Sequence, residues 1–286
     1  MSSPIDIDRQ EFLAVLGRRP LEVNHRLVGH PLLSLGVLAE LADTMRPDKV
    51  ERQRTDLDLV LPGGGNSRGG VESPGDLVRG IETGDAWVVL WNVEDDHRYR
   101  ELMDEILDPI EAVLRDREGG MCRREAFLFI SSAASVTPVH FDPEHNLLLQ
   151  IRGTKQIHIG KFAATTQGQR ELERYYMGGH RNIEHMPQEG DVFRLEPGKG
   201  VYVPSHAPHW VTNEGRACVS LSITFHTKAI LRRSKVHVVN HHLRRIGIEP
   251  SPPDQSEVID GMKLAFHRAA RAARLLRARF TQVLRR

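Results

Sequence analysis

The hydrophobic positions follow different patterns in different parts of the chain. Apolar side chains recur every three or four residues from 32 to 42 and from 99 to 114, which predicts a helix in each segment. From Glu125 onward the apolar runs become short and are β-branched or alternating, with turn residues between them. These runs are Ala126–Ser131, Asn146–Ile151, Lys155–Ile159, Val192–Leu195, Val201–Val203, Trp210–Thr212 and Val219–Phe225. Many short strands punctuated by glycine and proline predict a sandwich, a jelly roll or a barrel.

The segments around this strand-rich region differ from it. Residues 1–85 are expected to form an N-terminal mixed helical segment that packs on the core, residues 86–230 form the core, and residues 231–286 form a helical basic region. Within the core, Trp87–Trp91 is expected to be a strand and Gln167–Tyr176 a helical insert. The glycine-rich run at 63–70 lacks the spacing of a phosphate-binding loop, so a surface loop is expected there, with an active-site lid as the alternative.

Charge and cysteine content narrow the class of protein. The formal net charge is +1, but residues 261–286 hold eight Lys or Arg and no Asp or Glu, so the body is acidic and the tail is basic. Two cysteines, Cys122 and Cys218, form no C-x-x-C pattern, which favours the cytoplasm over an oxidising compartment. No secretory signal and no apolar run long enough to span a bilayer are visible in the sequence.

The first candidate chemistry is a metal site. His140 and Asp142 are two residues apart, and on a strand such side chains point the same way. A third ligand would come from His206 or His209, in the turn after Val201–Val203. Two imidazoles and one carboxylate on one side of a metal, with the other positions open, are typical of non-heme Fe(II) oxygenases. Histidine is abundant here, with 15 copies, so an H-x-D pair alone is a weak signal.

Such an oxygenase needs a source of two further electrons, and 2-oxoglutarate supplies them in one large class. Its distal carboxylate needs a buried cation and a hydroxyl, which Lys155 and Thr137 can provide. The turn Arg152-Gly153-Thr154 would swing Lys155 back beside the H-x-D strand. Considered alone, Lys155 is more simply interpreted as a solvated lysine of a hairpin, and Thr137 as an ordinary strand residue.

A resemblance favours the functional reading. The decisive segment is Thr137-Pro-Val-His140-Phe-Asp142-Pro-Glu-His-Asn146-Leu-Leu-Leu-Gln150-Ile-Arg-Gly153-Thr-Lys155. It resembles the JmjC branch of the cupin superfamily, and most closely the type of the asparaginyl hydroxylase that inhibits hypoxia-inducible factor. In that pattern a Thr precedes the first His by three residues, an Asn follows it by six and a Lys by fifteen, as they do here. The resemblance covers roughly residues 85–230.

The resemblance implies the roles of the remaining site residues. The segment Pro197-Gly-Lys-Gly-Val-Tyr202-Val-Pro204, followed by His209 five residues later, is similar to the family's last motif and makes His209 the third ligand. Lys155 and Thr137 would anchor 2-oxoglutarate, and Asn146 would orient its chelating end or the bound oxygen. Thr224 stands where the asparaginyl hydroxylase has an Asn near the co-substrate. The family's Gly-Asp is Gly198-Lys199 here, which affects a turn more than the chemistry.

The implied fold is mainly β, a double-stranded β-helix of the cupin or jelly-roll kind, with flanking helices and a basic C-terminal helix. The implied activity is Fe(II)-, 2-oxoglutarate- and O2-dependent hydroxylation of a C–H bond, with a peptide or protein side chain as the leading substrate. The alternatives are a JmjC-like oxygenase of nucleic acid or of a small metabolite, a redox-neutral metal cupin, and a non-catalytic cupin-like binding module. A module that only bound metal would not need Lys155 and Thr137.

The basic tail carries a regular seam. Its apolar members alternate spacings of four and three, which predicts one helix: Met262, Phe266, Ala269, Ala273, Leu276, Phe280 and Val283. Arginines cover the other faces. A seam this regular favours burial against a second copy, so a homodimer is expected, while binding to an anionic membrane or to nucleic acid is the alternative.

Overall fold

The structure is a computed structural model that describes residues 3–53 and 73–283. The glycine-rich run at 63–70 lies outside the described residues. The chain divides into two compact units. Unit 1 comprises Met1–Phe162 and Arg181–Thr227, and unit 2 comprises Ala163–His180 and Lys228–Arg286.

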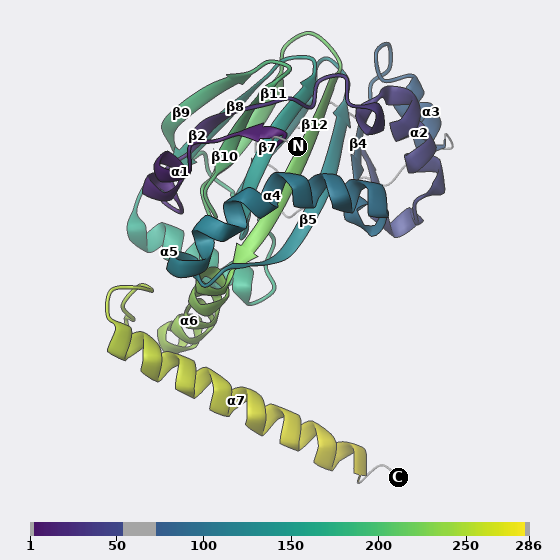
Figure 1. Cartoon of the computed structure of the whole chain (residues 1–286). Coiled ribbons are helices and arrows are strands. Elements are labelled where there is room, and N and C mark those ends of the chain that lie inside the picture. Colours follow the sequence, from purple (N-terminus) through teal and green to yellow (C-terminus); the bar gives the residue numbers. More distant parts are fainter. Residues whose placement is uncertain (1–2, 54–72, 284–286) are drawn as a thin grey trace. The chain divides into compact units, whose positions relative to one another are not determined.

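Two antiparallel sheets form unit 1. Among the described residues the larger sheet has eight strands, and Figure 1 shows several of them side by side. Their spatial order is β1 (Ile5–Asp6), β2 (Leu21–His25), β10 (Lys199–Val203), β7 (His145–Arg152), β12 (Cys218–Thr227), β5 (Met121–Ser131), β4 (Trp87–Leu90) and β3 (Val50–Gln53). The smaller sheet runs in the order β6 (Val136–His140), β11 (His209–Asn213), β8 (Lys155–Lys161) and β9 (Gln188–Leu195).

The large sheet is buried on both faces, and the alternation along β7 shows how. Leu147 and Leu149 belong to one apolar cluster, which they share with the helices. Leu148, between them, belongs to a second cluster with Ile157 and Val211 of the small sheet. Since successive strand residues face opposite ways, the strands of the large sheet are layered between helices and the small sheet. The second cluster therefore fills the space between the sheets, where the site lies.

The helices of unit 1 cover the outer face of the large sheet. They are α1 (Arg9–Val15), α2 (Leu35–Thr44), α3 (Pro74–Arg79) and α4 (His97–Glu118), with 3-10 turns at Pro31–Leu33, Pro47–Lys49 and Val93–Asp95. The longest, α4, lies across the strands (Figure 1) and buries its apolar stripe, including Tyr99 and Ile106. Asp96 caps its N-terminus, with a carboxylate that accepts a hydrogen bond from the Arg98 amide, and Gly119 caps its C-terminus with a φ of 73°.

This architecture confirms the predicted fold class, a jelly-roll core with flanking helices. Helix accounts for 41% of residues and strand for 29%, so more residues are helical than extended although the core is β. The first 53 residues are less helical than expected, because β1, β2 and β3 all join the large sheet. The division into segments 1–85, 86–230 and 231–286 stays a prediction.

Unit 2 is helical. It contains α5 (Thr165–Tyr176), α6 (Lys228–Arg245) and α7 (Glu257–Val283). Arg244 of α6 donates to the buried carboxylate of Glu173 on α5 at 2.9 Å, and His237 stacks on Tyr176 with ring centroids 5.6 Å apart. The predicted insert and basic C-terminal helix are therefore both present. None of the helices in the described part of the chain is long and apolar enough to cross a membrane.

Candidate metal centre

Two histidines face each other across neighbouring strands of the small sheet. His140 ends β6 and His209 begins β11, and the antiparallel register pairs these two residues directly. Their ring centroids are 4.2 Å apart and both side chains are buried. The register shifts between His209 and Val211, so the strands are irregular next to the site.

Asp142 completes the cluster from just beyond the end of β6. Its carboxylate oxygens lie 3.8 Å from Nε2 of His140 and 3.6 Å from Nε2 of His209. One ligand atom from each of the three residues lies within 4.8 Å of the others, and all three residues are buried. The H-x-D pair was expected on one strand, but β6 ends at His140, and Asp142 reaches the same point from the following turn.

The two imidazoles are held in the tautomer that a metal ligand needs. Nδ1 of His140 lies 2.7 Å from the carbonyl oxygen of Pro138, and Nδ1 of His209 lies 2.9 Å from that of Ala207. A carbonyl can only accept, so each Nδ1 donates its proton and each Nε2 keeps a lone pair directed at the cluster. Backbone carbonyls in this position commonly orient histidine ligands.

The electrostatics favour a neutral His140 and an ionised Asp142. Burial lowers the pKa of His140 to about 3, with further lowering from His209 and Arg181. Burial by itself would raise the pKa of Asp142, but Arg181, His140 and His209 hold it well below its ordinary value. At neutral pH these protonation states give a neutral imidazole from His140 and an anionic carboxylate from Asp142.

His206, the competing third ligand, lies elsewhere. It adopts a left-handed backbone conformation with a φ of 66°, and its amide donates to the carbonyl oxygen of Asp142 at 2.7 Å. Its ring lies 6.3 Å from that of Phe141 and takes no part in the three-residue cluster found among the described residues. The geometry therefore groups His209, and not His206, with His140 and Asp142.

Sequence reasoning missed Arg181. Its guanidinium donates to Oδ1 of Asp142 at 2.6 Å, and it lies 5.8 Å from the ring centroid of Trp91. Arg181 belongs to no motif in the sequence and follows Asp142 by 39 positions. Only the folded chain brings it to the site.

The proposed co-substrate anchors lie on the same small sheet. Thr137 of β6 and Ile157 of β8 both pair with Val211 of β11, so these two residues lie at the same level on either side of β11. Lys155 pairs with Asn213, two positions further along β11. Lys155 and Ile159, the partner of His209, are therefore separated by on the order of 13 Å along β8. A lysine side chain and a five-carbon dicarboxylate can together span that separation.

Lys155 is the most unusual charged residue of the site. It is only 4% exposed, and its ammonium makes no hydrogen bond or ion pair with any residue in 3–53 or 73–283. Burial lowers its pKa, and the nearby thiol of Cys218 opposes that effect. A buried charge without a partner is costly, which indicates that an anion belongs beside it.

Polar residues on the large sheet face the metal cluster. Asn146 of β7 pairs with Thr224 of β12, so the two lie side by side. Nδ2 of Asn146 lies 3.5 Å from Oδ2 of Asp142, and its Oδ1 accepts a hydrogen bond of 2.8 Å from Ser222. The hydroxyl oxygen of Thr224 is buried and has no hydrogen-bond partner in the described residues. This orphaned hydroxyl and the lone Lys155 ammonium both fit a bound oxygen-rich anion.

The family model described as the JmjC domain matches residues 103–232. Residues 103–232, a little under half of the chain, are similar to the JmjC domain. This domain spans the strands of the small sheet and the strands β5, β7, β10 and β12 of the large one. The recognition of a JmjC-type cupin oxygenase is thereby confirmed, while the asparaginyl-hydroxylase branch stays a prediction.

Solved structures share the fold of the JmjC domain. A structure of YcfD from Escherichia coli superposes with a TM-score of 0.55 at 17% identity, covering 93% of this chain and 68% of YcfD. A structure of the ribosomal oxygenase YcfD from the same organism gives a TM-score of 0.54 at 14% identity, covering 94% of this chain and 68% of that one. A YcfD complex with cobalt and 2-oxoglutarate gives 0.53 at 16% identity, covering 93% and 67%. A comparison with curated protein sequences finds no match.

Proposed function

We propose that this protein is an Fe(II)- and 2-oxoglutarate-dependent dioxygenase that hydroxylates a C–H bond in a peptide or protein side chain. The observation that carries the proposal is the buried Lys155 ammonium, without a partner among the described residues, on the sheet that holds His140 and His209. A metal-binding module or a redox-neutral cupin has no use for a buried cation there. A dicarboxylate co-substrate does.

The residues present fit the metal. His140, Asp142 and His209 would hold Fe(II), leaving further positions open. With 2-oxoglutarate and O2 bound, the iron supplies the chemistry that inserts one oxygen atom into a C–H bond, while the other oxygen atom ends in succinate as CO2 is released. The protein's task is to bind, orient and desolvate the reactants.

The chain's own residues divide that task. Lys155 neutralises the distal carboxylate of 2-oxoglutarate, and Thr137 is expected to add a hydroxyl to it. Thr224 has a free buried hydroxyl to donate, and Asn146 is tied to both Asp142 and Ser222, so it is held ready to orient a ligand. The apolar cluster between the sheets excludes water around these groups and strengthens their interactions.

A redox-neutral cupin would use additional histidine or glutamate ligands, and none joins the three-residue cluster of the described chain. His145 is buried against Tyr202, with a contact of 2.7 Å between its Nδ1 and the phenol oxygen. His158 stacks on Trp210 at 4.8 Å between ring centroids. The three-residue set of the described chain thus lacks a fourth histidine, which favours the oxygenase.

A protein substrate is supported by structural likeness. YcfD is a ribosomal oxygenase, and it shares the fold of this chain. Fold-level analogy supports a protein substrate and, more narrowly, a ribosomal protein. Hydroxylation of nucleic acid or of a small metabolite is the alternative, and the experiment below distinguishes these classes.

The test is mass spectrometry after aerobic incubation with Fe(II) and 2-oxoglutarate. Ribosomal proteins, RNA oligonucleotides and a metabolite mixture are supplied separately, and each is searched for the gain of one oxygen atom. Lys155→Met should abolish the gain, whereas Lys161→Met, at the exposed end of the same strand, should leave it unchanged. Absence of any 2-oxoglutarate-dependent oxygen gain, together with no binding of 2-oxoglutarate, would overturn the proposal.

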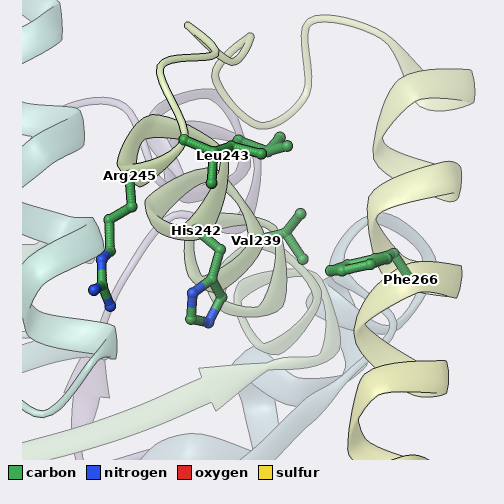
Figure 2. A pocket seen from close by; sticks show the side chains of 6 residues that line it. Val239, His242, Leu243, Arg245 and Phe266 are labelled. Atoms are coloured by element: carbon green, nitrogen blue, oxygen red, sulfur yellow. The ribbon is translucent and has the colours of Figure 1, made fainter.

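The expected homodimer rests on unit 2. Val239 and Leu243 of α6, with Phe266 of α7, line an apolar groove with His242 and Arg245 at its sides (Figure 2). Met262 and Phe266 of the predicted seam are 68% and 60% exposed. An apolar helix seam of this kind supports association with a second copy, because an identical seam is its natural complement. Contact of the basic tail with nucleic acid or a membrane is the alternative.

A further inference from the structure

The two oxygens of Asp142 have different neighbours. Oδ1 accepts a hydrogen bond from Nη1 of Arg181 at 2.6 Å and lies 3.8 Å from Nε2 of His140. Oδ2 lies 3.6 Å from Nε2 of His209 and 3.5 Å from Nδ2 of Asn146. A charge-assisted bond of 2.6 Å is short and strong, so one oxygen is held by the guanidinium while the other faces the imidazole of His209.

The backbone fixes the place of Arg181. The amide of Phe141 donates to the carbonyl oxygen of Arg181 at 3.2 Å, and the amide of Ile183 donates to that of Val139 at 3.2 Å. A β-bridge between His140 and Asn182 lies between these bonds. Residues 181–183 therefore pair with the edge of β6, the strand that ends at the first metal ligand, His140.

An aromatic ring supports the other side of the guanidinium. Arg181 lies 5.8 Å from the ring centroid of Trp91, whose indole nitrogen donates to Glu51 at 3.1 Å. Trp91 also packs edge-on against Phe127, with ring centroids 5.0 Å apart. The ring is thus held from two sides, and it limits the guanidinium to a narrow range of positions.

We propose that Arg181 is a positioning residue of the metal centre, holding Oδ1 of Asp142 so that the aspartate binds the ion through Oδ2 alone. This inference rests on the proposed function. A carboxylate that binds through one oxygen leaves the remaining positions open, and a chelating 2-oxo acid needs two of them. Without Arg181 the carboxylate is free to rotate and bind through both oxygens, which takes one of those positions.

The expected signature separates metal binding from co-substrate binding. In Arg181→Gln, Co(II) should still bind, because all three ligands remain and a cation that repels the ion is gone. The visible absorption spectrum of bound Co(II) should change, because the number of oxygen ligands changes. The affinity of the Co(II)-loaded protein for 2-oxoglutarate should fall by about tenfold. This is the lower end of the range of effects observed when the hydrogen-bond partner of a metal ligand is removed.

Two further variants separate positioning from a purely structural role. Arg181→Lys keeps a cation next to Asp142 and should restore part of the 2-oxoglutarate affinity, although lysine lacks the planar fork. Arg194→Gln is the matched control, because Arg194 is an exposed arginine on β9 of the same sheet, paired with Glu214 at 2.8 Å. This control should keep the wild-type Co(II) spectrum and 2-oxoglutarate affinity.

The Co(II) spectrum decides the inference independently of the proposed function. An Arg181→Gln protein with an unchanged spectrum would overturn the inference, whether or not the wild type binds 2-oxoglutarate. A wild type that binds Co(II) but no 2-oxoglutarate would overturn the proposed function alone. If Arg181→Gln shows no cooperative unfolding transition, Trp91→Leu is measured instead, because it removes the ring that limits the position of the Arg181 guanidinium. The Co(II) spectrum of Trp91→Leu should change in the same way as expected for Arg181→Gln, but by less. An unchanged spectrum would reject the inference.

Discussion

At the scale of single residues, Lys155 should affect folding and binding in opposite directions. Lys155→Met removes a buried charge that lacks a protein partner, so the ligand-free protein should become more stable to heat. The same change removes a charge-assisted hydrogen bond of about 1.5–3 kcal/mol, so 2-oxoglutarate affinity should fall at least about tenfold. Thermal unfolding and calorimetric titration of both proteins measure the two effects.

The contradicting outcome for Lys155 is equally specific. A variant that binds 2-oxoglutarate as tightly as the wild type would mean that the distal carboxylate lies elsewhere. Lys161→Met controls for loss of charge, since Lys161 lies on the same strand with an exposed side chain.

The sequence predicted most of the site, and the limits have physical reasons. His140, Asp142 and Lys155 lie within 16 positions of one another, so their spacing could be matched to a motif. The predicted hairpin that would bring Lys155 beside the H-x-D strand is wrong, because β7 joins the large sheet, β8 joins the small one, and β11 lies between β6 and β8. Arg181 could not be predicted, because its contact with Asp142 depends on residues 181–183 pairing with the edge of β6. That pairing forms after a helical insert and leaves no periodic trace in the sequence.

At the scale of elements, the turn between β7 and β8 determines where Lys155 lies. Gly153 has a φ of +71°, and a Cβ added there would lie 2.4 Å from the carbonyl oxygen of Ala217. Gly153→Ala should therefore cost the strain of a left-handed residue, about 1–2 kcal/mol, and a backbone clash in addition. Gly215→Ala is the control, since its φ is +65° but nothing lies within 4 Å. Urea unfolding should show a clearly larger loss for Gly153→Ala, and equal losses would contradict the close approach.

The packing of α5 on α6 should depend on pH through His237. Burial lowers the pKa of His237 to about 4, with further lowering from Lys263. The unfolded chain then binds the proton more tightly, so the contribution of His237 to stability is complete above pH 6.5 and is lost as the pH falls towards 4. The loss is at most about 3 kcal/mol.

The variant His237→Phe tests this pH dependence, because phenylalanine can still stack on Tyr176. Its free energy of unfolding should change less between pH 7.5 and pH 5 than that of the wild type. His241→Phe, on the same helix, should keep the wild-type slope. If the free energy of unfolding depends on pH equally in the wild type and in His237→Phe, then His237 binds its proton equally tightly in the folded and unfolded states, which contradicts the prediction.

Element boundaries were predictable where the strands are buried and not where they are exposed. Val201–Val203 and Val219–Phe225 are apolar runs, and both lie within observed strands. The strand β9 begins at Gln188, well before the predicted Val192. The first residues of β9 are exposed and polar, so they carry no apolar pattern, and they are extended because they pair with β8. The strands β1 to β3 were missed for the same reason: they are short, and a neighbouring strand defines each of them.

At the scale of the whole molecule, charge is unevenly distributed along the chain. Residues 261–286 carry eight basic and no acidic residues, so the rest of the chain is net negative. A tail of this kind is drawn to acidic surfaces, and a second copy offers one. The fold class was predictable from the strand pattern, whereas oligomeric state is not, because it depends on which exposed seam finds a complementary surface.

The homodimer prediction is tested on the seam itself. Met262→Glu with Phe266→Glu places two carboxylates on exposed apolar positions of α7, and burying them against a partner would be costly. The mass measured by light scattering should shift from dimer towards monomer. Arg268→Glu with Arg271→Glu is the control, on exposed positions outside the seam, and it changes charge more without removing apolar surface. A wild type that is monomeric at all concentrations contradicts the dimer. Loss of association in the arginine variant alone would indicate that charge, and not the seam, holds the partner.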